Sequence, residues 1–198
     1  MVGAVVEVGS EGLRSEKIEN KYSFRMVQNC QIEFKDVRIN EKQLMPKAVN
    51  YKIGVEKTLQ HSRIIVIWNT VGAGIGVFRA AVRALRAVLS SHKSYGLLRE
   101  KAMRLMGEVQ AMLLCAWRLT ELADKGGLET ATVGMFKAWV TGRGRSVCIL
   151  GKEIVGASGD VGVHKALLDM EVLYTYEGTY DINTLLAGSQ LTGLKAFT

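Results

Sequence analysis

The segment 174–183 reads Tyr-Thr-Tyr-Glu-Gly-Thr-Tyr-Asp-Ile-Asn, and it contains the side chain of this sequence that is best suited to proton transfer. Glu177 stands between Tyr176 and Gly178, and the nearest cation along the sequence is Lys165. A carboxylate held against an aromatic surface without a local cation takes up a proton more readily near neutrality, as a general base must. We therefore interpret Glu177 as a candidate base. The alternative is a surface carboxylate, which is the commoner role of a single Glu.

Composition places the chain among ordinary globular proteins. Its 198 residues, 48% hydrophobic and 23% charged, suit one domain or two small ones. We find no apolar run of the ~18 residues that span a membrane and no secretory leader, so we expect no membrane span. The three cysteines are far apart and have no His nearby, which predicts reduced thiols and no metal site.

The net charge of +7 is concentrated in residues 79–104, where seven basic side chains face one acid, Glu100. Arg79, Arg83 and Arg86 would share one face of a helix. Such a face could attract the phosphates of a nucleic acid, a cofactor or a substrate, or it could be a solvated helix face. No aromatic residues are interleaved for base stacking, so we expect no nucleic-acid partner.

The elements change character near residue 50. Before it, Val2–Val8, Tyr22–Val27 and Cys30–Ile39 are rich in β-branched and aromatic residues and are predicted strands. After it the pattern is helical. We therefore predict a mainly α protein with two parts: a short remnant of a β-domain at 1–50 and a four-helix bundle at 51–198.

Four helices are expected in the second part. A first stripe with helical spacing consists of Trp68, Val71, Ile75, Phe78, Val82, Leu85 and Leu89. A second consists of Ala102, Leu105, Val109, Met112, Ala116 and Leu119, and the pair Gly126-Gly127 should end that helix. A third helix is predicted at about 130–150, and a fourth follows Glu177.

Two glycine-rich segments have more than one interpretation. Gly72-Ala-Gly74-Ile-Gly76 has the wrong spacing and context for a dinucleotide fingerprint, so close packing of helices explains it better. Glycines from Gly156 to Gly162 could let a backbone approach a phosphate closely, or they could simply connect two helices.

Several segments together resemble the acyl-CoA dehydrogenase/oxidase family, nearest to its plant peroxisomal short-chain acyl-CoA oxidase and glutaryl-CoA dehydrogenase branches. The likeness runs from about Gly12 to Phe197. It rests on Arg-Met-Val-Gln-Asn (25–29), Ile-Glu-Phe-Lys-Asp-Val (32–37), Ser-Arg-Ile-Ile-Val-Ile-Trp (62–68), Val-Gln-Ala-Met (109–112), Trp-Arg-Leu (117–119), Gly-Ala-Ser-Gly (156–159) and the 174–185 segment, which is the most specific.

The resemblance implies a chemistry and a set of site residues. In this family a Glu removes the α-proton of an acyl-CoA thioester while the β-carbon delivers a hydride to FAD, and Glu177 matches that base. The positions implied to touch FAD are Thr179, Asn183, Gly156, Ala157, Ser158 and Gly159, the last four against the FAD of a neighbouring subunit. The positions implied near the acyl-CoA are Arg63, Tyr176 and Gly178.

The resemblance also implies partners and a location. We expect an acyl-CoA substrate, a homo-oligomer (dimer or tetramer) formed through the helical bundle, and a peroxisomal location, with mitochondrion or cytosol as alternatives. The sequence matches only the C-terminal half of a family member, and the family's Arg-x-x-Phe-Gly segment is not found in 86–96. A truncated flavin-dependent oxidase or dehydrogenase of fatty-acid β-oxidation is therefore expected. The alternative is a non-catalytic oligomerisation or interaction relative without a complete FAD site.

Overall fold

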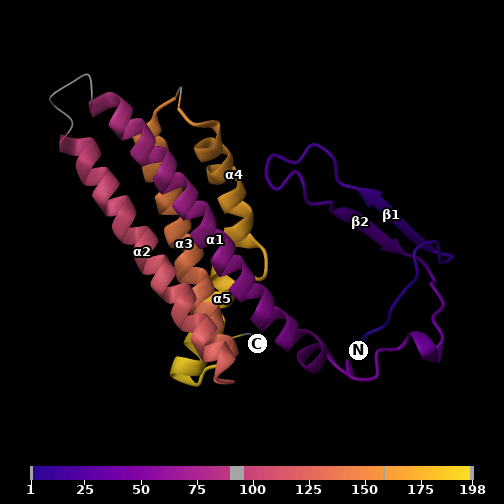
Figure 1. The fold of residues 1–198 in the computed structure, drawn as a ribbon. Helices are drawn as coiled ribbons and strands as arrows, with labels where there is room; N and C mark the ends of the chain where they lie inside the picture. The colour runs from indigo at the N-terminus through magenta and orange to yellow at the C-terminus, as the bar shows by residue number, and fades with distance from the viewer. Residues whose placement is uncertain (1, 90–95, 158, 197–198) are drawn as a thin grey trace. The chain divides into compact units, whose positions relative to one another are not determined.

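The computed structural model describes residues 2–89, 96–157 and 159–196, without the side chains of residues 51, 52, 88 and 89. The chain divides into two compact units, Met1–Leu59 and Gln60–Thr198. The elements, labelled in Figure 1, are β1 (Leu13–Lys17), β2 (Cys30–Phe34), a short 3₁₀ helix (Glu41–Gln43), α1 (Tyr51–Leu89), α2 (Gly96–Asp124), α3 (Thr130–Val155), α4 (Val161–Thr175) and α5 (Tyr180–Thr192). The predicted mainly α fold with a small β segment is confirmed.

The first unit contains an antiparallel hairpin in which Leu13 pairs with Phe34 and Lys17 pairs with Cys30. Only one of the three predicted strands is present, and it ends at Phe34 rather than Ile39. Val2–Val8 makes a single bridge, and Tyr22–Val27 forms a turn because Phe24 adopts a left-handed backbone with φ of 46°. The strand β1 escaped prediction because Leu-Arg-Ser-Glu-Lys is polar, and its pairing alone defines it.

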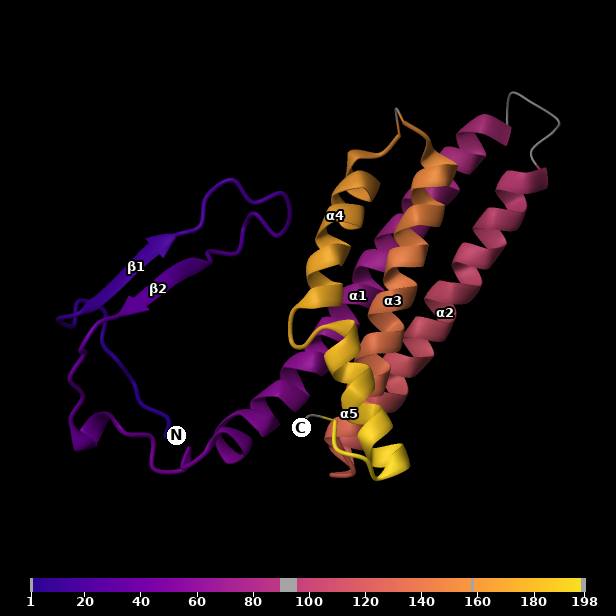
Figure 2. The same ribbon diagram turned by 180° about the vertical axis from the view of Figure 1, so that it is seen from behind.

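In the second unit α3 is the central helix. It packs against α2, α4 and α5, and both views show α1 to α4 running alongside one another (Figures 1 and 2). Its sequence explains this position, because small and apolar residues recur on every side of it. Its fully buried apolar residues include Val133, Ala138, Val140 and Val147.

The predicted stripe on α2 is confirmed, since all six of its members are buried. The predicted stripe on α1 is partly wrong, because Trp68 and Ile75 are each 36% exposed. Val71 of the stripe is buried, as predicted, but the other buried apolar residues of this part of α1 lie outside the stripe, namely Val66, Ile67, Val77, Ala80 and Ala81. Their small size lets neighbouring helices approach closely, whereas the prediction gave most weight to large side chains.

Glycines mark the closest helix contacts. A Cβ at Gly74 would lie 2.9 Å from Met112 Cε, so the predicted role in packing is correct there. At Gly72 and Gly76 a Cβ would meet nothing within 4 Å, so the prediction is wrong for these two. A Cβ at Gly151 would lie only 2.1 Å from Val77 Cγ1, which fixes the distance between α3 and α1.

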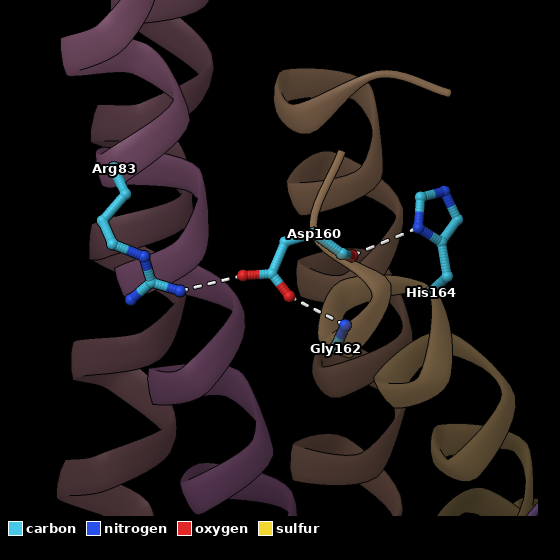
Figure 3. A network of polar contacts seen from close by, with 4 residues as sticks. All are labelled: Arg83, Asp160, Gly162 and His164. Carbon is cyan, nitrogen blue, oxygen red and sulfur yellow. Dashed lines mark hydrogen bonds and ion pairs between the residues drawn. The ribbon is translucent and has the colours of Figure 1, made fainter. Parts of the chain in front are cut away.

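Two helices differ from the prediction. The helix α3 continues to Val155, and α4 occupies Val161–Thr175, where no helix was expected. The N-terminus of α4 is capped by Asp160, whose carboxylate accepts from Gly162 N at 2.7 Å and pairs with Arg83 at 2.9 Å (Figure 3). The helix α4 has few buried residues, so the sequence contains no apolar stripe that predicts it. The bundle therefore contains α1 to α4, and α5 packs on α3 as a fifth helix.

One helix of the described chain is long and apolar enough to cross a membrane, the stretch Ile53–Ala87 of α1. The expectation that no such stretch exists is wrong. Of the most apolar window, 44% is buried inside the protein. Length and composition alone are weak evidence here, because the core helix of a soluble bundle passes the same test.

Candidate functional site

The candidate base lies in the short loop between α4 and α5, residues 176–179, which we call the Glu177 loop. Tyr176 caps α4, and its N–H donates to Val172 O at 2.9 Å. Thr179 caps α5 by accepting from Ile182 N at 3.2 Å. Between them Glu177 and Gly178 both have left-handed backbones, with φ of 57° and 90°. A left-handed conformation is unfavourable for a residue with a side chain, so contacts from the rest of the bundle must maintain it.

Two neighbouring residues of α1 hold Glu177. Ser62 Oγ donates to Glu177 Oε2 at 2.6 Å, and Arg63 Nε donates to the Glu177 carbonyl oxygen at 3.0 Å. Arg63 is 3% exposed, so its guanidinium supports the backbone of the loop from inside the bundle. Its predicted contact with acyl-CoA stays a prediction. Ser62 was missed because nothing in the sequence relates it to a residue 115 positions away.

Asn183 on α5 holds the next two carbonyls. Its side chain is fully buried, and Nδ2 donates to Gly178 O at 2.8 Å and to Thr179 O at 2.9 Å. Its Oδ1 has no hydrogen-bond partner among the described residues. A Cβ at Gly134 would lie 3.0 Å from the Asn183 backbone oxygen, so α3 leaves space for this residue. The implied contact of Asn183 with FAD stays a prediction.

Lys137 on α3 was not predicted, and it is fully buried. Its Nζ donates to Tyr174 O at 3.0 Å and to Gly178 O at 2.7 Å. The pKa of Lys137 is lowered to about 8. Loss of water around the ammonium is the largest cause, the charge of Arg63 also lowers the pKa, and the charge of Glu177 opposes the shift. The sequence held a signal, because Lys137 follows Val133 and Gly134 by one helical turn, on the buried face of α3.

These charges correct one premise of the sequence analysis. No cation lies near Glu177 along the chain, but Arg63 and Lys137 lie near it in space. Tyr176, Glu177 and Gly178 are half-buried, so the loop is neither enclosed in the core nor fully exposed to solvent. Burial raises the pKa of the Tyr176 hydroxyl, a hydrogen bond with Asn69 opposes this, and the Glu177 charge adds to it.

Aromatic rings join the two ends of the loop. Tyr174, near the end of α4, stacks on Tyr180, the first residue of α5, with ring centroids 5.4 Å apart. The Arg145 guanidinium lies 4.5 Å from the centre of the Tyr174 ring and pairs with Glu171 at 2.7 Å. Stacking of this kind stabilises by about 0.5–1.5 kcal/mol beyond burial of the ring surface. The Glu177 loop is thus fastened where it leaves α4 and where it enters α5.

The structure does not bring the second predicted cofactor segment to this site. Gly156, Ala157 and Gly159 lie beyond the other end of α4, whose fifteen residues rise about 22 Å. Gly156 ends α3 with φ of 73°, and both it and Ala157 are exposed. Ser158 lies outside the described residues, as do residues 90–95, where the family's Arg-x-x-Phe-Gly segment was sought.

Comparison with known proteins agrees with this architecture. The model of the family "Acyl-CoA dehydrogenase, C-terminal domain" matches residues 54–192. The fold is similar to glutaryl-CoA dehydrogenase from Mycobacterium smegmatis, with a TM-score of 0.89, 24% identity, and coverage of 100% of this chain and 52% of that one. A structure of a glutaryl-CoA dehydrogenase from the same organism in complex with FADH2 matches with a TM-score of 0.90 and 21% identity, and covers the same shares of the two chains.

Butyryl-CoA dehydrogenase from Megasphaera elsdenii is also similar, with a TM-score of 0.82, 19% identity, and coverage of 95% of this chain and 51% of that one. The chain therefore spans about half the length of these solved structures. At such sequence identities the structural similarity shows the fold alone, and the match to the family model over residues 54–192 shows the family. The chain belongs to the acyl-CoA dehydrogenase family, whose C-terminal helical domain occupies most of its length.

Proposed function

We propose that this chain supplies the base of a flavin-dependent acyl-CoA dehydrogenase or oxidase, which introduces a double bond between Cα and Cβ of an acyl-CoA thioester. The observation that carries the proposal is the presentation of Glu177. Its carboxylate is hydrogen-bonded at one oxygen, half-buried, and attached to a backbone that Arg63, Lys137 and Asn183 hold. A base must be fixed in this way to meet one particular C–H bond.

The step assigned to this chain is a proton transfer. The Cα–H bond of the thioester breaks, its electron pair forms the new carbon–carbon double bond, and the proton goes to Glu177. Ser62 donates to Oε2 of the carboxylate, and we assign the proton to Oε1. A bound flavin would accept the hydrogen of Cβ as a hydride, which completes the balance of electrons.

The residues present fit a flavin nucleotide in part. Thr179 is exposed, and because its oxygen accepts from Ile182 N, its hydroxyl proton remains able to donate to a ligand. At Gly156 the backbone is left-handed, and a Cβ would meet nothing within 4 Å, so a polar ligand group can approach it. Asn183 is fully buried and its amide donates to the loop carbonyls, so its contact with FAD stays a prediction. We propose Thr179 and the 156–159 segment as the cofactor contacts of this chain.

A homo-oligomer would explain the exposed apolar side chains of α2. Leu97, Leu114 and Trp117 are 67–68% exposed and Met103 is 58% exposed, although α2 has a well-buried opposite face. The same surface supports a second candidate function, a non-catalytic relative that uses the bundle for assembly. The two candidates differ in whether Glu177 matters.

Substitution of the base separates the two candidates. Glu177→Gln keeps the size of the side chain and removes the basic oxygen, so turnover of acyl-CoA should fall by about 10²–10⁴-fold while flavin absorbance remains with the protein. Glu100→Gln, an exposed carboxylate on α2, is the matched control and should leave turnover unchanged. Colourless wild-type protein, or turnover that survives Glu177→Gln, would contradict the proposal. Stable assembly without flavin would favour the alternative.

A further inference from the structure

A fully buried lysine is the least expected group near the Glu177 loop. Lys137 is 0% exposed, although lysine is among the residues least often found inside a protein. A buried ammonium is unfavourable unless hydrogen bonds and charges compensate for the lost water. The two carbonyls that compensate it, those of Tyr174 and Gly178, lie on either side of Glu177.

The carbonyl oxygens of Glu177, Gly178 and Thr179 in the loop, and that of Tyr174 at the end of α4, each accept from a side chain of a helix. Arg63 donates to Glu177 O, Asn183 to Gly178 O and Thr179 O, and Lys137 to Tyr174 O and Gly178 O. Lys137 differs from the other two donors in one respect. It contacts both the end of α4 and the loop, so a single ammonium joins the two.

We propose that Lys137 is a positioning residue, whose ammonium locks the left-handed backbone of the Glu177 loop and releases it on losing its proton. The proposal deepens the proposed function, since it assigns a control to the same base. It rests on the geometry of the two hydrogen bonds, which are strongest when the donor carries a charge. Neutral Lys137 still has N–H groups, so the loop would loosen without unfolding.

The surroundings of Lys137 bring its titration close to neutrality. Two charges act on its ammonium among the described residues: Arg63 from α1, which repels it, and Glu177 from the loop, which attracts it. Its direct contacts from α4 and the loop are uncharged carbonyls, and Asn183 from α5 is uncharged. With burial as the largest cause, the pKa of Lys137 is about 8. A rise of pH through this value would therefore weaken the lock.

Carbon-13 NMR of the whole chain tests the lock without flavin or substrate. Protein labelled at lysine Cε and at backbone carbonyl carbons is titrated across about one pH unit on each side of the pKa near 8. The expected result is one lysine that titrates near 8, with carbonyl shifts of Tyr174 and Gly178 that move at the same midpoint. A lysine signal at its ordinary value, or carbonyl shifts that ignore the titration, would overturn the proposal.

Variants test whether the charge of Lys137 holds the Glu177 loop in place. Lys137→Met keeps the length of the side chain and removes the charge, so the pH-dependent carbonyl shifts should disappear. Proteolysis or hydrogen exchange at residues 176–179 should accelerate by about 10–100-fold, the worth of hydrogen bonds from a charged donor. Lys152→Met, an exposed position on the same helix, should match the wild type. If Lys137→Met does not fold, the wild-type titration still decides the question.

Kinetics provides an independent readout in flavin-loaded protein. The wild type should lose kcat above pH 8 with little change in KM, and Lys137→Met should have a low kcat without that alkaline limb. Tyr176→Phe separates the other nearby group, because the pKa of Tyr176 lies above its ordinary value of 10.0 and gives a limb at higher pH. An alkaline limb that survives Lys137→Met would refute the lock. Absence of any turnover would instead contradict the proposed function and leave the NMR result valid.

Discussion

The hydroxyl of Ser62 lies 2.6 Å from the Glu177 carboxylate, although the two residues are 115 positions apart. The bond joins α1 to the loop between α4 and α5, so the first and last parts of the bundle meet at the candidate base. A short hydrogen bond to a carboxylate stabilises its charged form and restricts its rotation.

Removal of that hydroxyl should impair the base without dismantling the loop. In Ser62→Ala one oxygen of Glu177 loses its donor, and turnover should fall by about 10–100-fold, corresponding to a hydrogen bond with a charged partner. The loss should appear in kcat, because the carboxylate is no longer held in one orientation toward the substrate. Ser189→Ala, which removes a hydroxyl that donates to Leu186 O within α5, is the control. Equal turnover for both variants would show that Ser62 plays no part.

A methyl group at Gly178 should disturb the loop directly. The residue has φ of 90°, and a Cβ would lie 2.9 Å from Asn183 Nδ2 and 3.3 Å from Arg63 Nη2. Gly178→Ala should lower the free energy of unfolding by about 1–3 kcal/mol and reduce turnover. Gly188→Ala, in open space on α5, should instead be neutral or stabilise by about 0.5–1 kcal/mol. Denaturant unfolding of both variants measures the contrast, and similar losses would contradict it.

The free energy of unfolding should depend on pH because of Lys137. Its pKa is lowered on folding from 10.5 to about 8, so between these values the unfolded chain binds the extra proton. The free energy of unfolding of the wild type relative to Lys137→Met should therefore be lowest below pH 8. There the buried ammonium destabilises the whole fold, although it holds the Glu177 loop most firmly. The free energy of unfolding relative to that variant should rise with pH by at most about 1.4 kcal/mol per unit and level off above the unfolded value. Denaturant unfolding of both proteins at several pH values checks this, and a constant difference would be evidence against the buried charge.

The close contact between Gly151 of α3 and Val77 of α1 predicts that a second substitution can restore stability lost by a first. In Gly151→Ala the new methyl would lie 2.1 Å from Val77 Cγ1, and such overpacking should destabilise by about 1–3 kcal/mol. Adding Val77→Ala removes the clashing methyl groups, so the double variant should be more stable than the sum of the single effects implies. Gly107→Ala, where a Cβ meets nothing within 4 Å, is the control. Strict additivity in thermal or denaturant unfolding would argue against this close approach.

The spacing of apolar residues was sufficient to predict a helix where the buried residues recur with the helical period. The stripe on α2 and the stop at Gly126-Gly127 were predictable, since one face of α2 meets the core along its whole length. On α1 the same rule failed, because Gly74 and small neighbouring residues let other helices come close and left Trp68 on the outside. The helix α4 was missed because its buried residues are too few to make a stripe.

The sequence by itself determined that a helix follows Glu177, because the signals for a helix start are local. It also determined the family, through short segments spread along the chain. Only the tertiary structure decided which groups surround the base. Ser62, Arg63 and Lys137 reach the loop from helices distant in sequence, and their hydrogen bonds and charges depend on distances that no linear spacing encodes. The separation of Gly156, Ala157 and Gly159 from Glu177 likewise follows from the length of α4.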